Sequence, residues 1–430
     1  MPSNIVDVNL ETGASGIPRD TYSDVVLIGD TATTADPTYN TPQAFNDASD
    51  VAAAYGDDVG VTTASEAVES KGAEAWWTVV AETTTHENEL IADSDTSSVS
   101  SGTLANAPVH GGVDHVTVNL DGSEQTVMPS TASPPPAPNS GEAALNFDTG
   151  ELTLADSSSG SGPGIEVTYD TLDWTALTTQ MEEHDLDLAV LADTPIDKSH
   201  IGDLSELVSF GEANDIGVVV AYDSFTNYES QEAAMDAHHD IGSYVPSRTV
   251  LPVSHGATTD VDVAAQQAGR LAVRAPWFDP MWDSQADFTF GAEYFREALV
   301  GEPGDPNTLE GGNADEEGPT NVIIPVAGTK LLSNSLTTAG SGSAYQYFDV
   351  FRTEAFMAEE VENALTQLQM SSSKIPFAPN GRTMVVDALR SRLRGYVSTG
   401  QLQTVTTTDI SQSGDGGDGG DGGDEGDDEG

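Results

Sequence analysis

Along much of the chain, short apolar runs alternate with stretches whose apolar residues recur at helical spacing. The apolar runs predict buried strands and the periodic stretches predict helices. The predicted strands are Asp24–Gly29, Ala75–Ala81, Leu186–Leu191, Ile216–Tyr222, Thr249–Val253 and Asn321–Val326. The predicted helices are Thr41–Tyr55, Ser65–Gly72, Trp174–His184, Asp203–Asn214, Ser230–Tyr244, Thr259–Val273 and Ala292–Leu299. The alternation predicts a mixed α/β (α+β) fold with a core α/β domain, in which helices cover a mixed sheet.

Between about His86 and Gly164 the pattern changes. Ser, Thr, Gly, Asn and Asp dominate, and prolines interrupt a series of short alternating runs. The runs Asp114–Leu120, Ala144–Phe147 and Glu151–Leu154 predict strands joined by turns. We therefore expect an inserted β-rich domain at the periphery, after which Ile165–Tyr169 returns the chain to the core.

The block Tyr345–Leu402 predicts two amphipathic helices joined by a turn that carries Pro and Gly. One apolar stripe holds Met357, Val361, Ala364, Leu365 and Leu368, and the other holds Val385, Leu389, Leu393 and Tyr396. These positions suit a helical hairpin packed on its own core. The Thr-rich run Gln401–Ile410 predicts a strand. The GDGGDGG repeat beyond it lacks apolar residues and predicts disorder.

These elements predict seven regions along the chain. They are an N-terminal arm and linker (1–20), the first part of the core domain (21–85), the β-rich insertion (86–164), a further α/β region (165–330), the helical hairpin domain (331–400), a C-terminal arm strand (401–412) and a disordered acidic tail (413–430).

The net charge of the chain indicates a high-salt environment. The formal charge is −57, from 14 basic and 71 acidic residues. Such self-repulsion weakens a compact state at ordinary ionic strength, whereas at molar salt the screening length falls to about 3 Å. This composition predicts a protein of an extreme halophile, from a haloarchaeal cell or its virus. A mesophilic protein with an acidic tail is the alternative.

Composition also argues against several classes. There is no cysteine, which excludes disulfides, thiol nucleophiles and thiolate metal sites. The chain has no basic stripe for phosphate contacts, so we expect no nucleic-acid partner. The first residues lack the features of a signal peptide, and no apolar run is long enough to cross a bilayer. We expect a soluble protein made in the cytoplasm, without membrane insertion.

Candidate chemistry is sparse. The sequence has no G-x-S-x-G elbow, no H-E-x-x-H motif and no Gly-Lys pair of a P-loop. We weighed His238-His239-Asp240 as a metal cluster and favour a solvated helix end. We weighed Ser254-His255-Gly256 as a nucleophile with its base and favour a polar turn, because a triad converges in space. The Gly/Asp tail has the wrong period for a calcium array. We therefore predict no catalytic, metal-binding or cofactor-binding residue, and no enzyme.

The tryptophans offer a further alternative. Trp76, Trp77, Trp277 and Trp282 could be ligand platforms, but aromatic residues in or beside strands are more often core or interface anchors. We assign them no binding role.

The two ends of the chain point to assembly. Strand-like segments at residues 4–10 and 401–410 hang from turn-rich links, and free strands need another chain to complete them. The predicted inter-subunit arm residues are Ile5, Val6, Val8, Leu10, Leu402, Val405 and Ile410. If each subunit donates its ends to its neighbours, the contact does not close and a helical array results.

Half of the fourteen basic residues lie in or just before the C-terminal block. They are Lys330, Arg352, Lys374, Arg382, Arg390, Arg392 and Arg394. In so acidic a protein, this concentration suggests a surface that meets acidic partners. We take Arg382, Arg390, Arg392 and Arg394 as candidate interface charges. The alternative is that they are ordinary exposed charges worth about 0–1 kcal/mol each.

The order of these features resembles the sheath subunits of contractile phage tails and related contractile injection systems. The opening, GIPRDTYSDVVLIGDTATTADPTYNTPQAFNDASDVAAAYG, is similar to the N-terminal pattern of sheath subunits. The closing, FDVFRTEAFMAEEVENALTQLQ and then KIPFAPNGRTMVVDALRSRLRGYVSTGQL, is similar to their two-helix ending with its arm strand. The acidic tail after Ile410 departs from that pattern.

The resemblance implies a helical homo-oligomer around an inner tail tube protein, with baseplate and tail terminator proteins as further partners. It implies that woven arms hold the array together while it contracts, and that the helical hairpin faces the tube. It also implies a place in a virion tail assembled in a haloarchaeal cytoplasm, or in a released injection particle. Other readings stay open: a tube or baseplate component of the same machine, or a halophilic hydrolase with an unrecognised active site.

Overall fold

The computed structural model describes residues 24–34, 37–92, 100–157, 164–258, 262–280, 288–301, 305, 307–311, 318–340, 343, 346–372, 375 and 379–398. The chain falls into two compact units, Met1–Phe356 and Met357–Gly430. Their boundary lies within the long helix α8 (Phe348–Ser371). The finer division into seven regions stays a prediction.

The first unit contains an eight-stranded sheet in the order β17–β16–β13–β12–β11–β1–β3–β2. Its strands are β1 (Val25–Gly29), β2 (Gln43–Phe45), β3 (Trp76–Val80), β11 (Leu188–Leu191), β12 (Gly217–Ala221), β13 (Val250–Ser254), β16 (Asn321–Val326) and β17 (Thr329–Leu332). The strands from β16 to β3 run parallel, and the two edge strands pair antiparallel. The predicted mixed α/β class is therefore confirmed.

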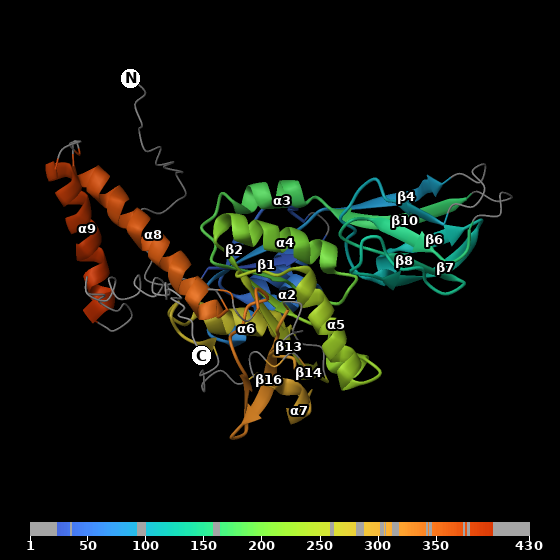
Figure 1. The fold of residues 1–430 in the computed structure, drawn as a ribbon. Coiled ribbons are helices and arrows are strands. Elements are labelled where there is room, and N and C mark those ends of the chain that lie inside the picture. The colour runs from blue at the N-terminus through green and yellow to red at the C-terminus, as the bar shows by residue number, and fades with distance from the viewer. Residues whose placement is uncertain are drawn as a thin grey trace, which may run out of the picture. The chain divides into compact units, whose positions relative to one another are not determined.

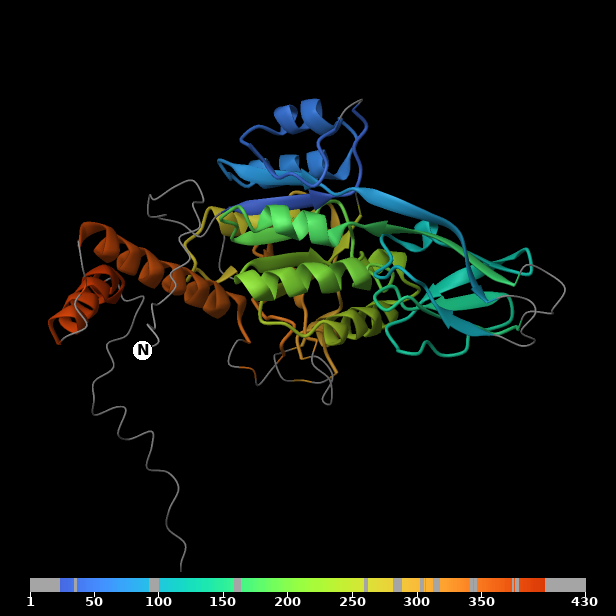
Figure 2. The same ribbon diagram turned by 90° about the horizontal axis from the view of Figure 1, so that it is seen from above.

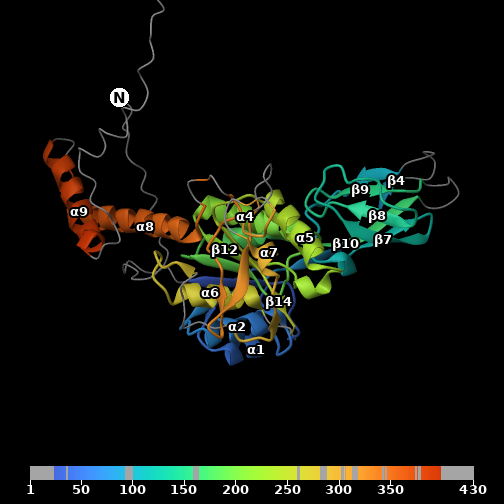
Figure 3. The same cartoon turned by 60° about the horizontal axis from the view of Figure 1, so that its bottom comes forward.

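Helices cover both faces of this core sheet, which explains why β11, β12 and β13 are buried along their whole length. Figures 1 and 3 show α4 on one face and α2 with α6 on the other. The helices of this region are α1 (Ala48–Tyr55), α2 (Gly60–Ser70), α3 (Trp174–Met181), α4 (Ile201–Asn214), α5 (Gln231–Tyr244) and α6 (Val263–Ala272). Side-chain caps from Asp47, Ser230 and Asp262 start α1, α5 and α6.

A second, seven-stranded sheet has the order β4–β10–β6–β7–β8–β9–β5. Its strands are β4 (Thr83–Ala92), β5 (Ser101–Thr103), β6 (Thr117–Leu120), β7 (Ser123–Pro129), β8 (Glu142–Leu145), β9 (Glu151–Leu154) and β10 (Ile165–Leu172). Figure 2 shows the long strands β4 (blue) and β10 (green) leading from the core into this sheet. The sheet curls, since a Cβ atom added at Gly102 of β5 would lie 2.1 Å from Ile91 Cγ2 of β4.

The two sheets share one apolar core. A continuous cluster of buried residues contains Val26 and Ile28 from β1 together with Val118 and Leu145 from the second sheet. Trp76 is also buried, and its indole N–H donates to Ser65 Oγ at 3.0 Å. We therefore place Trp76 among the core anchors of the first unit, and the two sheets fold as parts of one packed body.

Several predicted elements were wrong in detail. Ile165–Tyr169 reaches the shared apolar core, but its strand, β10, belongs to the second sheet, because it pairs with β4 and β6. The segment predicted as one helix from Thr41 starts with β2. The segment Ala292–Leu299 divides into β15 (Ala292–Glu293), which pairs with β14 (Gly256–Ala257), and α7 (Glu297–Val300). Two short 3-10 turns, η1 (Val113–His115) and η2 (Phe225–Asn227), were not predicted.

The second unit contains the rest of α8 and α9 (Pro379–Ser398). Its apolar stripes are mostly half-buried: of the nine residues predicted for them, Ala364 is buried and the other eight keep partial exposure. A polar contact joins the two helices. Glu360 of α8 is 1% exposed, accepts from Arg392 Nη2 at 2.7 Å and from the Tyr396 hydroxyl at 2.9 Å. The hairpin therefore has a small apolar core and leaves partly exposed apolar surface.

Candidate functional site

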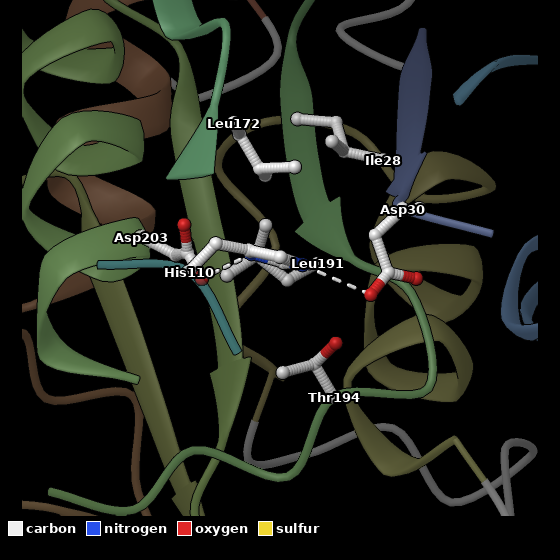
Figure 4. A pocket seen from close by; sticks show the side chains of 8 residues that line it. Ile28, Asp30, His110, Leu172, Leu191, Thr194 and Asp203 are labelled. Carbon is white, nitrogen blue, oxygen red and sulfur yellow. Dashed lines mark hydrogen bonds and ion pairs between the residues drawn. The ribbon is translucent and has the colours of Figure 1, made fainter. Parts of the chain in front are cut away.

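A pocket lies at the carboxyl ends of β1 and β11, where the strand order of the core sheet reverses. The strand β1 has β3 on one side and β11 on the other. In open α/β sheets this switch point is the usual place for a ligand. Figure 4 shows the pocket and its lining, which includes Ile28, Asp30, His110, Leu172, Leu191, Thr194 and Asp203.

The imidazole of His110 lies in this pocket between two acidic side chains. Its Nδ1 atom is 2.7 Å from Asp203 Oδ2, and its Nε2 atom is 3.0 Å from Asp30 Oδ2. Asp30 follows β1, and Asp203 lies in the first turn of α4. His110 comes from the loop between β5 and η1 of the second sheet. The three residues thus join parts of the first unit that are far apart in sequence.

Two further donors hold Asp203. The backbone N–H of Gly111 donates to Asp203 Oδ2 at 3.2 Å, and the indole N–H of Trp174 donates to Oδ1 at 3.2 Å. The Asp203 side chain is 3% exposed, and Asp30 is 41% exposed. A carboxylate in the first turn of a helix also interacts favourably with the helix dipole. Asp203 is therefore the buried, fixed member of the cluster.

The neighbouring acids determine the protonation of His110. Burial by itself lowers the pKa of His110, because it disfavours the imidazolium. The hydrogen bonds and charges of Asp203 and Asp30 outweigh burial and raise the pKa of His110 to about 10. The hydrogen bond to His110 is the main reason why the pKa of Asp30 falls to about 2. At neutral pH the pocket therefore holds an imidazolium.

The pocket is too small for a substrate. Its free volume is about 20 Å³, which is room for about one water molecule, whereas small-molecule sites usually have roughly 300–1,000 Å³. His110 occupies the space that a ligand would take in an α/β enzyme. The arrangement is therefore an internal cluster of ionised side chains, with no room for a substrate.

Two runs weighed as catalytic or metal sites come together inside the first unit. His238 of α5 and Ser254 of β13 are both 0% exposed, and His238 Nδ1 is 2.8 Å from Ser254 Oγ. The other ring nitrogen of His238 lies 3.1 Å from the backbone carbonyl oxygen of Asp223. A catalytic histidine needs an orienting acid and access to substrate. Neither the carbonyl partner nor the burial fits that role.

Burial also removes the charge of these histidines. Desolvation is the main cause that lowers the pKa of His238 to about 3 and the pKa of His255 to about 4. The predicted solvated helix end at His238-His239-Asp240 was therefore wrong for the two histidines, whereas the Asp240 side chain is 45% exposed. The run Ser254-His255-Gly256 is a buried polar connection between β13 and β14. His238 and Ser254 face the interior, where they bond to each other and Ser254 Oγ also lies 2.9 Å from Thr320 Oγ1.

The basic residues of the C-terminal block do not form one surface. Arg352 is 0% exposed and donates from Nη2 to the carbonyl oxygens of Leu271 at 3.0 Å and Arg274 at 3.3 Å. It therefore caps the last turn of α6. Lys330 is half-buried and donates to the carbonyl oxygen of Phe288 at 2.9 Å. Lys374 lies outside the described residues.

The four candidate interface arginines all lie on α9. Arg382, Arg390 and Arg394 are exposed, whereas Arg392 is half-buried in its ion pair with Glu360. Three of the four thus present charge to solvent in the single chain. The predicted arm residues Ile5, Val6, Val8, Leu10, Leu402, Val405 and Ile410 lie outside the described residues, as does Trp282.

Sequence reasoning missed the Asp30–His110–Asp203 cluster. His110 is separated by 80 residues from Asp30 and by 93 residues from Asp203. Spacing of that size leaves no local pattern. The one available signal was the acidic residue directly after the strand-like run Asp24–Gly29, at a position where α/β folds place functional side chains.

The described part of the chain has neither a cluster of metal ligands nor a membrane-spanning helix. Within it, no three His, Asp or Glu side chains are grouped so that they could hold a metal ion. None of its helices is both long enough and apolar enough to span a bilayer.

No protein-family model matches the chain, and no curated protein matches its sequence. Solved structures do match its fold. A chain of the sheath complex of an extracellular contractile injection system, PVC, in the contracted state has a TM-score of 0.51 at 11% identity, over 90% of this chain and 79% of that chain. The helical sheath of the anti-feeding prophage (AFP) in the contracted state has a TM-score of 0.51 at 12% identity, over 94% and 87%.

A chain of the six-fold symmetrised AFP baseplate matches with a TM-score of 0.50 at 11% identity, over 91% of this chain and 87% of that chain. At such identities the likeness concerns the fold. It extends over about nine-tenths of the chain. The chain therefore has the fold found in the sheath structures of these contractile particles.

Proposed function

We propose that this protein is the structural subunit of a contractile tail sheath. It polymerises helically around an inner tube and contracts to drive the tube through a cell envelope. The observation that carries the proposal is the fold likeness to two contracted sheaths across 90% and 94% of the chain. The proposal assigns no catalytic, metal-binding or cofactor-binding residue. His110 fills the pocket at the switch point of the core sheet and leaves no room for a ligand there, which supports the absence of such residues.

The helical hairpin supports a role in assembly. Eight of the nine predicted stripe residues of α8 and α9 stay partly exposed in the single chain, and Met370 is 80% exposed. Partly exposed apolar surface next to exposed arginines is typical of a surface that another protein covers. We propose that neighbouring subunits or the tube cover this hairpin.

The chain ends supply the second kind of contact in the proposal. The segments Ile5–Leu10 and Leu402–Ile410 would pair as strands with neighbouring subunits. The core sheet offers an acceptor, because β17 forms its edge and is four residues long. Contacts of this kind are heterologous and propagate along a helix. They would hold the array together while the bodies of the subunits move.

Contraction needs only a small difference between two packings of the subunit. Two such packings can differ by about a few kcal/mol, and the gain adds up over all subunits in the array. The partners in this proposal are other copies of the chain, the inner tube protein, and baseplate and tail terminator proteins. Neither nucleic acid nor a membrane is a direct partner.

The environment is part of the proposal. With a charge of −57, copies of this chain would repel one another at low salt and associate when salt screens the repulsion. We propose a haloarchaeal host, assembly in its cytoplasm, and a final place in a virus tail or in a released injection particle.

Electron microscopy of the purified protein tests the function directly. In negative stain at molar salt, we expect tubes, rings or striated rods, and we expect them to dissociate when salt is diluted, because the subunits are strongly acidic. Monodisperse globules under every salt condition, together with turnover of ester or peptide substrates, would favour the hydrolase reading and contradict the proposal.

Charge reversal on α9 tests the surface. The double variant Arg390→Glu, Arg394→Glu should assemble poorly at intermediate salt and recover at higher salt, because acidic partners would then face added acidic charge. The measurement is the pelleted fraction across a salt series. Arg296→Glu is the matched control, since the Arg296 side chain is 60% exposed and lies outside the hairpin. Normal polymerisation of the double variant would show that these arginines are ordinary surface charges.

A baseplate component is the second candidate, because one matching chain belongs to a baseplate structure. A sheath subunit forms long arrays by itself, whereas a baseplate component forms a closed ring. The lengths of the assemblies in the same micrographs distinguish the two: rings of constant size without growth along the axis would favour the baseplate.

A further inference from the structure

We propose that Asp30, His110 and Asp203 form a clamp, in which His110 acts as a built-in cationic ligand of the switch-point pocket and fixes the loop Ala105–Val116 to the core sheet. Loss of the imidazolium charge would release this loop. The inference concerns the subunit itself and does not depend on its assembly.

The imidazole of His110 fits the pocket closely. Both ring nitrogens reach an acidic oxygen, at 2.7 Å and 3.0 Å. The His110 side chain is 10% exposed, so the ring fills the pocket, and only about 20 Å³ stays open. An imidazolium with both N–H groups bonded to acids is a complete hydrogen-bonding arrangement. The pocket is therefore built around this one side chain.

The clamp connects the second sheet to the core sheet. The backbone of its loop belongs to the second sheet: Val109 N–H donates to Phe147 O at 2.7 Å, and His110 N–H donates to Asp170 O at 2.8 Å. The side chain of His110 instead reaches residues that follow β1 and begin α4. The backbone and the imidazole of one residue thus bond to opposite sides of the boundary between the two sheets.

The positive charge of His110 separates two acidic side chains. Without His110, Asp30 and Asp203 would share a small pocket with no intervening cation, which is unfavourable for two acids. Other titratable groups surround the clamp. His115 of η1 has its ring 6.0 Å from that of His110 and pairs with Asp170 of β10. Burial, and then the charges of Asp148 and Asp203, raise the pKa of Glu206 of α4.

His200 at the start of α4 faces the same loop near Gly112 and pairs with Asp197. None of these neighbours bonds to both sides of the boundary as His110 does. Other contacts nevertheless cross it, since the Tyr244 hydroxyl donates to Asp148 Oδ2 at 2.7 Å and the apolar core is continuous. Release of the clamp therefore frees the loop and leaves the two sheets together.

The sign of the pH dependence follows from the raised pKa of His110. A group whose folded-state pKa exceeds its unfolded value stabilises the fold most below the unfolded pKa. The stabilisation by His110 is thus complete below pH about 6.5 and is lost as pH rises toward about 10. The pKa of Asp30 is lowered to about 2, so the stabilisation by Asp30 is complete above pH about 4 and is lost on further acidification. The clamp is therefore most stable between pH about 4 and pH about 6.5.

Hydrogen exchange with chemical rescue tests the clamp in the full chain. We expect His110→Gly to raise amide exchange in residues 105–116 by about tenfold or more, which corresponds to a loss of about 1.4 kcal/mol in local stability. Added imidazole at pH 7 should restore protection, because it refills the pocket. His115→Gly is the matched control, because the His115 side chain is 47% exposed. Added imidazole should not change amide exchange in that variant.

Two further measurements keep the test decisive if the glycine variant folds poorly. His110→Gln keeps a donor toward one acid and should show an intermediate rise in exchange that imidazole does not reverse. In the wild-type protein, nitrogen NMR of labelled histidine should find His110 doubly protonated at pH 8. A neutral His110 at pH 8, or imidazole rescue that is equal in both glycine variants, would overturn the proposal.

Discussion

Replacing Arg352 with methionine should lower the free energy of unfolding by about 3 kcal/mol. The guanidinium is fully buried and donates to the carbonyl oxygens of Leu271 and Arg274 at the end of α6. Methionine fills similar space but leaves these acceptors without the bonds from Arg352. It also removes a positive charge from a helix C-terminus, where such a charge is favourable. Urea unfolding at constant molar salt measures the change.

Two control variants separate the cap from the charge. Arg352→Lys keeps the positive charge but cannot reproduce the planar guanidinium, so it should recover only part of the loss. Arg296→Met removes an exposed arginine and should change stability by about 0.5 kcal/mol or less. Equal stability of the wild-type protein and Arg352→Met would show that Arg352 contributes nothing as a cap.

Asn321→Asp should lower the free energy of unfolding by about 4 kcal/mol at neutral pH. Asn321 begins β16 and is 0% exposed. Its amide N–H₂ group donates to the carbonyl oxygens of Pro252 and Leu336, each at 2.8 Å, and its Oδ1 accepts from Leu336 N–H at 2.7 Å. An aspartate of the same shape would direct an acidic oxygen at two carbonyl oxygens. The fold would then have to bury an unmatched charge.

This loss should depend on pH. Burial raises the pKa of the introduced carboxyl above its unfolded value, so the destabilisation should shrink as pH falls and the group is protonated. Asn88→Asp is the matched control, because Asn88 is exposed and its φ of 51° suits either residue. A pH-independent loss, or a loss equal to that of the control, would contradict the account.

The position of Asn321 explains why its effect is large. The strand β16 pairs with β13 through only two residue pairs, Val253 with Asn321 and Ser254 with Val322. The hairpin of β16 and β17 therefore depends on side-chain bonds at its base. Exchange of the β16 amides should rise in Asn321→Asp more than exchange of the β12 amides, which a hydrogen-exchange experiment on the same variant can measure.

The core strands were readable from the sequence. The predicted strand Leu186–Leu191 contains β11, and Ile216–Tyr222 contains β12. A strand covered by helices on both faces needs a continuous apolar run, and such a run is visible locally. The C-terminal helices were also readable, because their apolar stripes recur at helical spacing within each element.

The sequence did not show to which sheet each strand belongs. The run IEVTYDTL of β10 alternates between buried and half-buried positions. Alternation shows that one face is covered but does not name the partner strands, and β10 joined β4 and β6 of the second sheet. The start of α2 was misplaced for a related reason, since its Val and Thr residues have modest helix propensity and packing against α6 decides the outcome.

The sequence by itself determined the α/β class, the order of most elements, the acidic surface and the amphipathic C-terminal helices, because each of these depends on residues that are neighbours along the chain. Only the tertiary structure decided that Arg352 caps a helix inside the first unit, that His238 meets Ser254 in the core, and that His110 fills the switch-point pocket. Those outcomes depend on hydrogen-bond partners and burial that are supplied by distant segments, and no local pattern encodes them.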